Sequence, residues 1–312
     1  MIAEKLLERV QAGGLIAGSN PLLVMLSGGR DSVCMLDLAV RVRGADAVTA
    51  LHVNYGLREE AGADQAHCAQ LCEQLGVALE VEQVSRPEDS GNLQAWARER
   101  RYSAAARLAE ERDALIVTGH TADDQVETIL YRLASSPSRR ALLGMRAEDG
   151  RLVRPLLGTT REETTSYCEG RGLAWRDDAT NEEDSYARNR IRRGLIPELE
   201  KAHPAAKENV LRTAALLREE AELLDSLVDV ELAGGEGAPP GAIAHQRFVE
   251  LHPALRRLVL QRLADEAAGR PVAGAARFAD QVANLTRGGS VLDLGSGVRA
   301  VLEAGVLRAE SS

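Results

Sequence analysis

Apolar and polar positions along the first half of the chain follow two alternating patterns. Short apolar runs that predict buried strands lie at residues 22–26, 47–53, 78–84 and 114–118. Apolar residues three and four apart predict helices between and after these runs, at residues 32–43, 63–75, 93–112 and 122–133. Strands that alternate with helices are joined by right-handed crossovers into a parallel sheet that is covered on both faces. We therefore predict an α/β fold with a parallel, doubly wound sheet.

Beyond residue 142 the pattern becomes mainly helical. A last strand is predicted at 152–157, a short helix at 161–170, and a long helical region from about residue 187 that is interrupted at Pro204. A linker rich in Gly and Pro at 234–241 precedes two helices and a set of short strands, predicted at 248–268, 275–286 and 290–308. We predict three parts: an α/β domain over residues 1–195, a helical connector and linker over 196–241, and a small α+β domain over 242–312.

A glycine loop with the sequence Ser-Gly-Gly-Arg-Asp-Ser occupies residues 27–32, between the first predicted strand and the first helix. Two adjacent glycines let backbone N–H groups face one anion, and the helix N-terminus adds partial positive charge. Ser27 and Ser32 add hydroxyl donors, and Asp31 beside phosphates indicates a divalent cation, Mg²⁺. The alternative is a tight turn in which Asp31 only caps the helix.

Two further polar segments follow predicted strands: residues 52–58 end the second strand and residues 119–125 end the fourth. Because parallel strands present their carboxyl ends at one edge of the sheet, we expect both segments beside the glycine loop. Asp124 and Glu127 are three residues apart, so they share a helix face and can present two carboxylates to a metal or an ammonium group. In the alternative reading, Asp123 caps the helix and the other two are favourable first-turn charges. His120 is expected at the rim.

Composition and charge exclude several classes of protein. The chain has 312 residues, 45% hydrophobic and 27% charged, and no apolar run approaches a membrane span, so we expect a globular cytoplasmic protein. Its four cysteines are too few and too irregular for a disulfide framework. A net charge of −9 argues against broad affinity for nucleic acid, but arginines gather within 139–161 and 188–193. These two groups either hold a phosphate backbone or form a solvated face.

The glycine loop resembles the signature of the N-type ATP pyrophosphatases, the PP-loop superfamily, which cleave ATP between its α and β phosphates and adenylate a substrate. Residues 52–58, 119–128 and 178–192 further resemble the tRNA(Ile)-lysidine synthetases, so the resemblance covers most of residues 20–200. It implies an adenine nucleotide alpha-hydrolase-like fold. It also implies that the C2 oxygen of the wobble cytidine in tRNA(Ile) with a CAU anticodon is adenylated, and that the amino group of free L-lysine then displaces AMP to give lysidine.

The resemblance implies roles for particular residues. ATP binding is expected at Ser27, Gly28, Gly29, Arg30, Asp31, Ser32, His52 and Asn54. Asp31 would also hold Mg²⁺. Asp124 and Glu127 are expected to bind the substrate lysine, or one of them to act as its base, and together with Asp31 and Arg190 they are the expected catalytic residues. The tRNA is expected at Arg139, Arg140, Arg188 and Arg192, and a second copy of the chain is a further candidate partner.

The chain also departs from the family pattern. Tyr55 and Thr121 stand where the family commonly has histidines, and residues 134–140 replace its Arg-Gly-x-Gly stretch, so Arg139 and Arg140 are expected to take over that role. A tRNA thiolase of the same superfamily is the alternative function, but the spacing of Cys68 and Cys72 is not the usual Cys-x-x-Cys. A non-catalytic RNA-binding module would have no use for a glycine loop and an acidic site on one rim.

Overall fold

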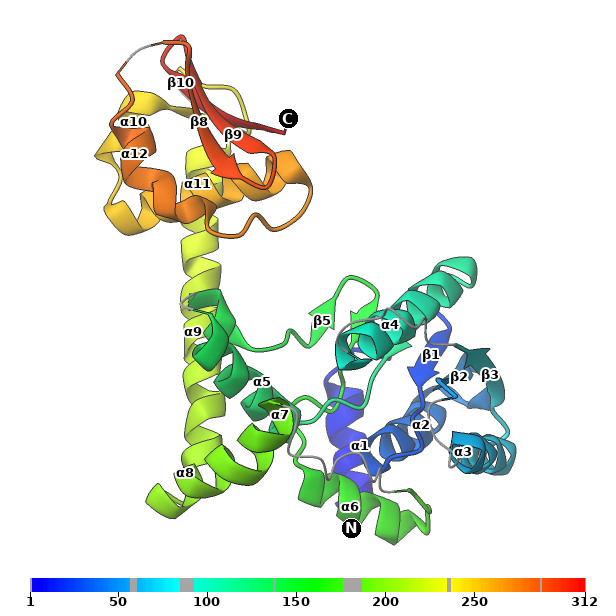
Figure 1. Ribbon diagram of the computed structural model, residues 1–312. Helices are drawn as coiled ribbons and strands as arrows, with labels where there is room; N and C mark the ends of the chain where they lie inside the picture. The colour runs from blue at the N-terminus through cyan, green and yellow to red at the C-terminus, as the bar shows by residue number, and fades with distance from the viewer. Residues whose placement is uncertain are drawn as a thin grey trace. The chain divides into compact units, whose positions relative to one another are not determined.

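The protein divides into two compact units, Met1–Ala215 and Leu216–Ser312, and each is described by itself. The computed structural model (Figure 1) describes residues 2–56, 61–84, 93–136, 139–176, 187–234, 237–286 and 288–311. Helix α9 (Ala206–Leu232) begins in the first unit and ends in the second. None of the described helices is both long enough and apolar enough to cross a membrane.

The first unit is built on a six-stranded sheet. Its strands are β1 (Leu22–Met25), β2 (Val48–Asn54), β3 (Ala78–Gln83), β4 (Leu115–Val117), β5 (Glu148–Asp149) and β6 (Leu152–Val153). They lie in the order β3-β2-β1-β4-β6-β5, and all neighbouring pairs are parallel except β5 with β6. The order places β1 centrally, with its neighbours β2 and β4 on either side. The predicted parallel, doubly wound sheet is confirmed.

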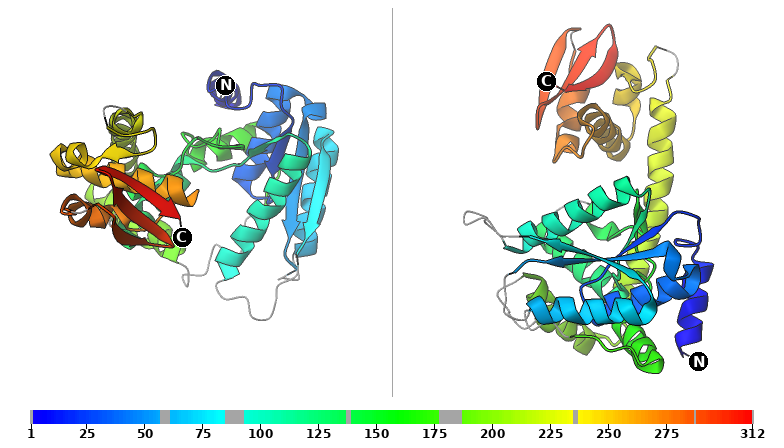
Figure 2. Two further views of the ribbon diagram at one scale, coloured as in Figure 1. Left: turned by 90° about the horizontal axis from the view of Figure 1, so that it is seen from above. Right: turned by 90° about the vertical axis from the view of Figure 1, so that its right-hand side faces the viewer.

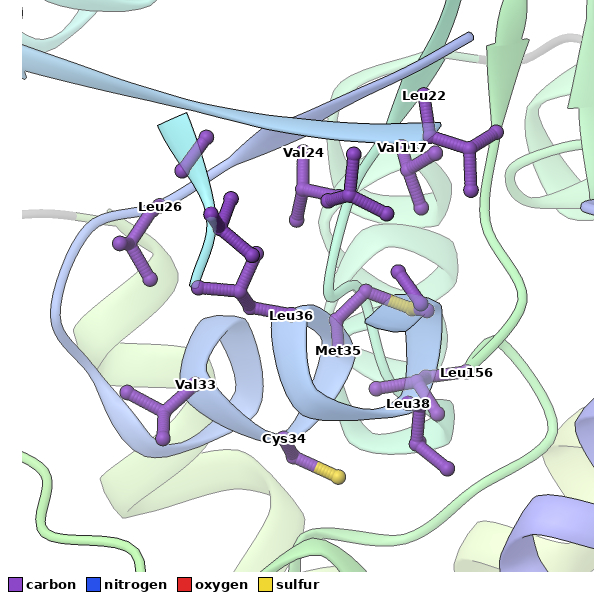
Figure 3. Packing of buried hydrophobic residues seen from close by; sticks show 14 of the residues in the cluster. Leu22, Val24, Leu26, Val33, Cys34, Met35, Leu36, Leu38, Val117 and Leu156 are labelled. Atoms are coloured by element: carbon purple, nitrogen blue, oxygen red, sulfur yellow. The ribbon is translucent and has the colours of Figure 1, made fainter. Parts of the chain in front are cut away.

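Helices cover both faces of this sheet, as the right panel of Figure 2 shows. These are α2 (Arg30–Arg43) and α3 (Ala61–Leu75) on one face and α4 (Leu93–Glu111) on the other. Helices α1 (Ile2–Ala12) and α6 (Arg161–Arg171) pack against α2, and α5 (Ala122–Ser135) packs with residues 191–196. Successive residues of β1 point to opposite faces, so Leu22 and Val24 pack with α2 and α3, while Leu23 and Met25 pack with α4. Figure 3 shows Leu22 and Val24 above Met35 of α2. Burial on both faces explains why β1 is apolar at every position.

The predictions for the segment after β4 are confirmed only in part. The strand predicted at 152–157 is only the two residues of β6, because the chain turns after Arg154 and Pro155. The long helical region is confirmed from residue 187, but as α7 (Ala187–Arg190), a π turn (Ile191–Leu195), α8 (Ile196–Ala202) and α9. The break between α8 and α9 falls at Pro204, as predicted. Residues 178–186 of the segment 178–192, which carries part of the family resemblance, lie outside the described residues.

Helix α6 is fixed to α2 through a buried polar contact. Asp37 of α2 is 1% exposed, and its carboxylate accepts hydrogen bonds from the Tyr167 hydroxyl at 2.5 Å and from Arg171 at 3.1 and 3.2 Å. A buried carboxylate needs such partners, because burying one unpaired charge costs on the order of several kcal/mol. The contact therefore sets where α6 lies on the helix that begins at the glycine loop.

The second unit combines short helices with an antiparallel sheet, and it contains the end of α9. Its further elements are β7 (Ile243–Ala244), α10 (His245–Glu250), α11 (Pro253–Ala268), a 3₁₀ turn (Ala275–Phe278), α12 (Ala279–Ala283), β8 (Ser290–Gly295), β9 (Val298–Glu303) and β10 (Val306–Ser311). The sheet order is β7-β10-β9-β8. Phe248, Leu260 and Leu307 are fully buried in its core. The helix predicted at 248–268 is split, because Pro253 begins α11. The boundaries predicted at 195 and 241 stay predictions.

Candidate active site

The glycine loop joins the end of β1 to the start of α2. Gly28 has φ +85°, a conformation that side chains with a Cβ rarely adopt, and Gly29 caps α2 without a side-chain hydrogen bond. The Ser27 and Ser32 hydroxyls lie 3.1 Å apart across the loop, and the Ser32 hydroxyl donates to the Gly29 carbonyl at 2.7 Å. The loop is thus held closed by its own hydroxyls, around a helix N-terminus whose first N–H groups favour an anion.

The glycine loop lies directly against the end of β4. A Cβ on Gly119 would come within 2.5 Å of the Asp31 carbonyl oxygen and 3.0 Å of the Ser32 backbone nitrogen. Only a glycine permits this approach, since neither backbone atom can give way cheaply. The two segments that the sequence placed on one rim are therefore in contact.

Asp31 is held by side chains from α2 and α6. Its Oδ1 accepts a hydrogen bond from the Thr164 hydroxyl at 2.5 Å and another from Arg30 Nε at 3.1 Å. Its Oδ2 lies 3.8 Å from Arg161 Nε. Thr164 is fully buried, so its hydroxyl is fixed in place. The carboxylate is oriented by these contacts, and its role is not that of a helix cap, which Gly29 occupies.

Arg161 lies at the centre of an acidic cluster, which we define as Asp31, Asp123, Asp124 and Glu127. Its guanidinium donates to Asp124 Oδ1 at 2.7 Å and to Glu127 Oε1 at 2.9 Å, and its backbone N–H donates to Asp123 Oδ2 at 2.8 Å. The Arg161 side chain is 18% exposed. Asp124 and Glu127 do share one helix face, as predicted, and the protein supplies the cation between them.

Capping of α5 involves Thr121 rather than Asp123. Thr121 accepts a hydrogen bond from the Asp124 backbone N–H, and Asp124 Oδ2 accepts one from the Thr121 N–H at 2.8 Å, which completes a capping box. The position where the family commonly has a histidine thus carries a helix cap here. Asp124 therefore caps the helix with Oδ2 and pairs with Arg161 through Oδ1.

Other cations approach the acidic cluster from its edges. Arg192 Nε lies 3.6 Å from Glu127 Oε1, and Lys207 Nζ lies 3.3 Å from Asp123 Oδ1. Burial raises the pKa of Glu127 above its ordinary value, although the neighbouring Arg161 opposes this. The Arg192 contact with Glu127 is longer than the contact that Arg161 makes with the same oxygen at 2.9 Å, so Arg161 is the closer cation of Glu127.

The predicted ATP-binding residues of β2 have other partners in the protein. His52 is 5% exposed, and its Nδ1 lies 3.0 Å from the Leu26 carbonyl and 3.4 Å from Cys68 Sγ. Asn54 donates to Gln65 at 2.8 Å and accepts from the Gly56 backbone at 2.9 Å. His52 therefore contacts the residue just before the glycine loop, whereas Asn54 contacts α3 and the backbone that follows β2. Their contact with ATP stays a prediction.

The predicted arginines separate into different surroundings. Arg192 lies at the acidic cluster, whereas Arg190 lines a hollow of about 380 Å³ with Tyr131, Ser135 and Leu195. The side chains of Arg139 and Arg140 lie outside the described part of the chain. These positions do not test the roles in tRNA binding and catalysis that the sequence predicts for the arginines, and the roles stay predictions.

Sequence reasoning missed two residues that hold the site together, Arg161 and Thr164. Arg161 was counted only as part of a basic group, because nothing in the sequence places the start of α6 against α5. A signal exists in Thr160-Arg161-Glu162-Glu163, which forms a capping box in which Thr160 accepts from the Glu163 N–H at 3.2 Å. The box fixes Arg161 as the first residue of a helix, but not what it faces.

Comparison with known proteins identifies the class to which this site belongs. A model of the PP-loop domain family matches residues 2–199. The chain therefore belongs to the PP-loop family.

Two relatives that it resembles in sequence carry the same name. The chain is 39% identical over 264 residues to the tRNA(Ile)-lysidine synthase of Thermus thermophilus, an alignment that covers 83% of this chain and 51% of that protein. It is 35% identical over 251 residues to the tRNA(Ile)-lysidine synthase of Escherichia coli O157:H7, covering 78% of this chain and 58% of that protein. The chain thus spans roughly half the length of the curated relatives that it matches.

A solved structure supports the fold. The U34-tRNA thiolase from Methanococcus maripaludis superimposes with a TM-score of 0.59 at 17% identity, over 70% of this chain and 79% of that one. Identity at this level shows a shared fold and does not transfer a function.

Proposed function

We propose that this protein uses ATP to convert the wobble cytidine of tRNA(Ile) with a CAU anticodon into lysidine. The observation that carries the proposal is the bridge made by Arg161, which joins the carboxylate of the glycine loop to the acidic pair Asp124 and Glu127. One site thereby combines a phosphate cradle with carboxylates suited to an amine. Relatives named tRNA(Ile)-lysidine synthase match most of this chain, and this favours lysine as that amine.

The loop is suited to the leaving group of an adenylation. The backbone N–H groups at the start of α2 and the hydroxyls of Ser27 and Ser32 would hold the β and γ phosphates of ATP. Cleavage between the α and β phosphates transfers the AMP group to the C2 oxygen of the cytidine and releases pyrophosphate. Because donors fixed before the reaction need no rearrangement, they stabilise the developing charge efficiently.

The donor set at Asp31 fits one Mg²⁺. Oδ1 is engaged by Thr164 and Arg30, whereas Oδ2 is 3.8 Å from Arg161, beyond hydrogen-bond distance, so it retains lone pairs for a metal. Mg²⁺ is commonly bound by one or two carboxylates together with substrate phosphates. When bound, the ion would neutralise charge on the departing pyrophosphate.

The acidic pair is suited to the amine that attacks next. The ammonium group of L-lysine would enter beside Glu127, where Arg192 is 3.6 Å away, while Arg161 keeps Asp124 in place. An ammonium must lose a proton before it can attack, and the raised pKa of Glu127 makes it the better base of the pair. His120 is less suited to that role, because burial and nearby arginines lower its pKa to about 4.

The state of the cysteines favours lysidine formation over thiolation. All four cysteines are buried. Burial raises the pKa of Cys68 to about 12 and that of Cys72 to about 11, so both thiols stay protonated near neutral pH. Sulfur insertion that used a persulfide on this chain would need an accessible thiolate.

An incorporation assay tests the proposal. The protein is incubated with tRNA(Ile) bearing CAU, Mg²⁺, ATP and radiolabelled lysine, with methionine tRNA as the control RNA. We expect label in tRNA(Ile) and release of AMP. Asp31→Asn should abolish AMP release, whereas the exposed control Asp149→Asn should not. Sulfur transfer without lysine incorporation would reject the proposal.

A second variant separates the two half-reactions. Glu127→Gln should leave adenylation, measured as pyrophosphate release, largely intact and should lose lysine incorporation together with AMP release, since the amide keeps the shape but not the charge. If both steps fall equally, the acidic pair belongs to the ATP site, and the assignment to lysine is wrong.

A further inference from the structure

A second charged cluster lies beside the acidic one and has the opposite sign. We define the arginine cluster as Arg98 and Arg101 on α4, Arg132 on α5, Arg154 directly after β6, and Arg188 on α7. Residues 93–102 begin the helix that follows β3, so they lie toward the carboxyl edge of the sheet. The β4–β6 register brings Arg154 next to Thr118, whose N–H donates to the Val153 carbonyl at 3.1 Å. The cluster therefore surrounds the end of β4.

The charges of these arginines reach one another across four elements. Burial, followed by the charges of Arg188 and Arg154, lowers the pKa of Arg132. Burial lowers the pKa of Arg98 too, and Arg188 and Arg101 add to this. Such mutual repulsion costs stability, so the arrangement is not explained by folding alone.

Carboxylates do not compensate this cluster within the described part of the chain. There, none of the five arginines forms an ion pair. Their described polar contacts are with backbone carbonyls: Arg132 donates to Gly144 at 2.8 Å and Arg154 to Arg146 at 2.6 Å. Carbonyls orient a guanidinium without cancelling its charge.

Two guanidinium nitrogens in the cluster are buried without a hydrogen-bond partner. They are Arg101 Nε and Arg154 Nε, and Arg154 as a whole is only 6% exposed. An unsatisfied buried donor destabilises a protein, and more so when it is charged. Arg98 and Arg101 are oriented by the Tyr102 ring, with guanidinium carbons 4.7 and 5.7 Å from its centroid. Donors of this kind, held in place and unused, are the features of an anion site.

The charges of the arginine cluster also affect the pKa of His120. His120 Nδ1 lies 2.8 Å from the Thr118 hydroxyl, and the charges of Arg154, Arg101 and Arg98 act with burial to keep the ring neutral. Asp124, at the acidic cluster, opposes them. His120 thus feels charges from both clusters.

We propose that Arg98, Arg101, Arg132, Arg154 and Arg188 form a binding site for a backbone phosphate of the RNA substrate, beside the nucleotide that is modified. The assignment rests on the proposed function for the identity of the RNA. Guanidinium groups bind phosphate through paired N–H donors, so a phosphodiester would satisfy the donors and offset the repulsion together. The glycine loop, at the end of β1, serves the phosphates of ATP separately.

The test compares two double variants, one within α4 and one that combines a residue of α4 with Arg112, which directly follows this helix. Arg98→Gln/Arg101→Gln removes two arginines from the cluster. Arg107→Gln/Arg112→Gln removes the same charge from arginines paired with Glu82, Glu111 and Glu80, and is the matched control. Binding of tRNA(Ile) with a CAU anticodon is measured by fluorescence anisotropy over a range of salt concentrations, and ATP binding is measured without RNA. If the double variant does not fold, the single variant Arg98→Gln is used in the same two binding measurements.

The expected result is specific to RNA. The cluster variant should bind tRNA at least about tenfold more weakly, since one charge-assisted contact amounts to about 1.4 kcal/mol or more. The slope of log affinity against log salt should fall by about one for each phosphate contact that is lost. ATP affinity should not change, and the control should bind tRNA nearly as the unmodified protein does.

Two outcomes would overturn the proposal. If the cluster variant loses ATP affinity and keeps tRNA affinity, the arginines bind nucleotide phosphates. If it matches the control in both measurements, they bind neither. Lysine incorporation by the unmodified protein is scored separately, so a protein that makes no lysidine but shows arginine-dependent RNA binding refutes only the proposed function.

Discussion

Replacing Arg161 by glutamine should destabilise the protein because it removes the cation that Asp124 and the buried Glu127 share. The guanidinium lies 2.7 Å from Asp124 and 2.9 Å from Glu127. Removing one partner from a fully buried pair costs about 3–5 kcal/mol, whereas an exposed pair contributes about 0–1 kcal/mol. The Arg161 side chain is 18% exposed and Asp124 is 25% exposed, so an intermediate loss of about 2–3 kcal/mol is expected.

Urea unfolding at pH 7 measures this loss as a change in the free energy of unfolding. The matched control is Arg107→Gln, whose ion pairs with Glu82 and Glu111 are exposed and whose loss should cost less than about 1 kcal/mol. Glu127→Gln combined with Arg161→Gln should recover part of the loss, since the buried charge is then gone as well.

The pH dependence gives a sharper test of the same reasoning. Burial already raises the pKa of Glu127, and without Arg161 that pKa should rise further. A carboxyl with a raised folded-state pKa binds its proton more tightly when folded, so folding becomes more favourable as pH falls. The cost of Arg161→Gln should therefore shrink between pH 7 and pH 5. A cost below about 1 kcal/mol at pH 7, or one that is equal at both pH values, would refute the reasoning.

Three further outcomes are expected from unfolding measurements. Gly119→Ala should cost about 1–3 kcal/mol and weaken ATP binding, because its Cβ would meet backbone at 2.5 Å, whereas Gly170→Ala, with open space around it in α6, should stabilise by up to about 1 kcal/mol. Thr164→Val should cost about 1–2 kcal/mol through the lost bond to the loop carboxylate, and Thr165→Val, whose hydroxyl bonds only within α6, clearly less. His120 has a folded-state pKa of about 4, below the ordinary 6.5, so the stability that it contributes is present above pH 6.5 and is lost as pH falls towards 4. In His120→Asn, the fall in the free energy of unfolding between pH 7 and pH 5 should be smaller by up to about 2 kcal/mol.

The sheet and its rim could be predicted from the sequence because both depend on local patterns. The strand predicted at 22–26 corresponds to β1, and the helices predicted at 32–43, 63–75 and 93–112 begin within two residues of the starts of α2, α3 and α4. Parallel strands bring their carboxyl ends together whatever the loops contain, so the glycine loop and the segment after β4 were expected to be neighbours. The structure adds that Gly119 makes this contact a close one.

What could not be predicted depends on contacts between distant segments. Arg161 faces Asp124 and Glu127 across more than thirty residues of chain, and no spacing rule connects them. The strand predicted at 152–157 fails because an apolar run does not reveal where the chain turns. Thr121 rather than Asp123 caps α5 because hydroxyl and carboxylate caps are nearly equivalent by sequence.

Helix α6 makes the site less modular than its loop motif implies. Arg161 and Thr164 reach the loop carboxylate from α6, and Asp37 with Arg171 fixes α6 to α2. A glycine loop transplanted with only its strand and helix would keep the contact of Asp31 with Arg30 but would lose its contacts with Thr164 and Arg161. The site therefore depends on residues 22–43 and 161–171 together. Substitutions in α6 can alter the nucleotide site while every residue of the loop motif stays the same.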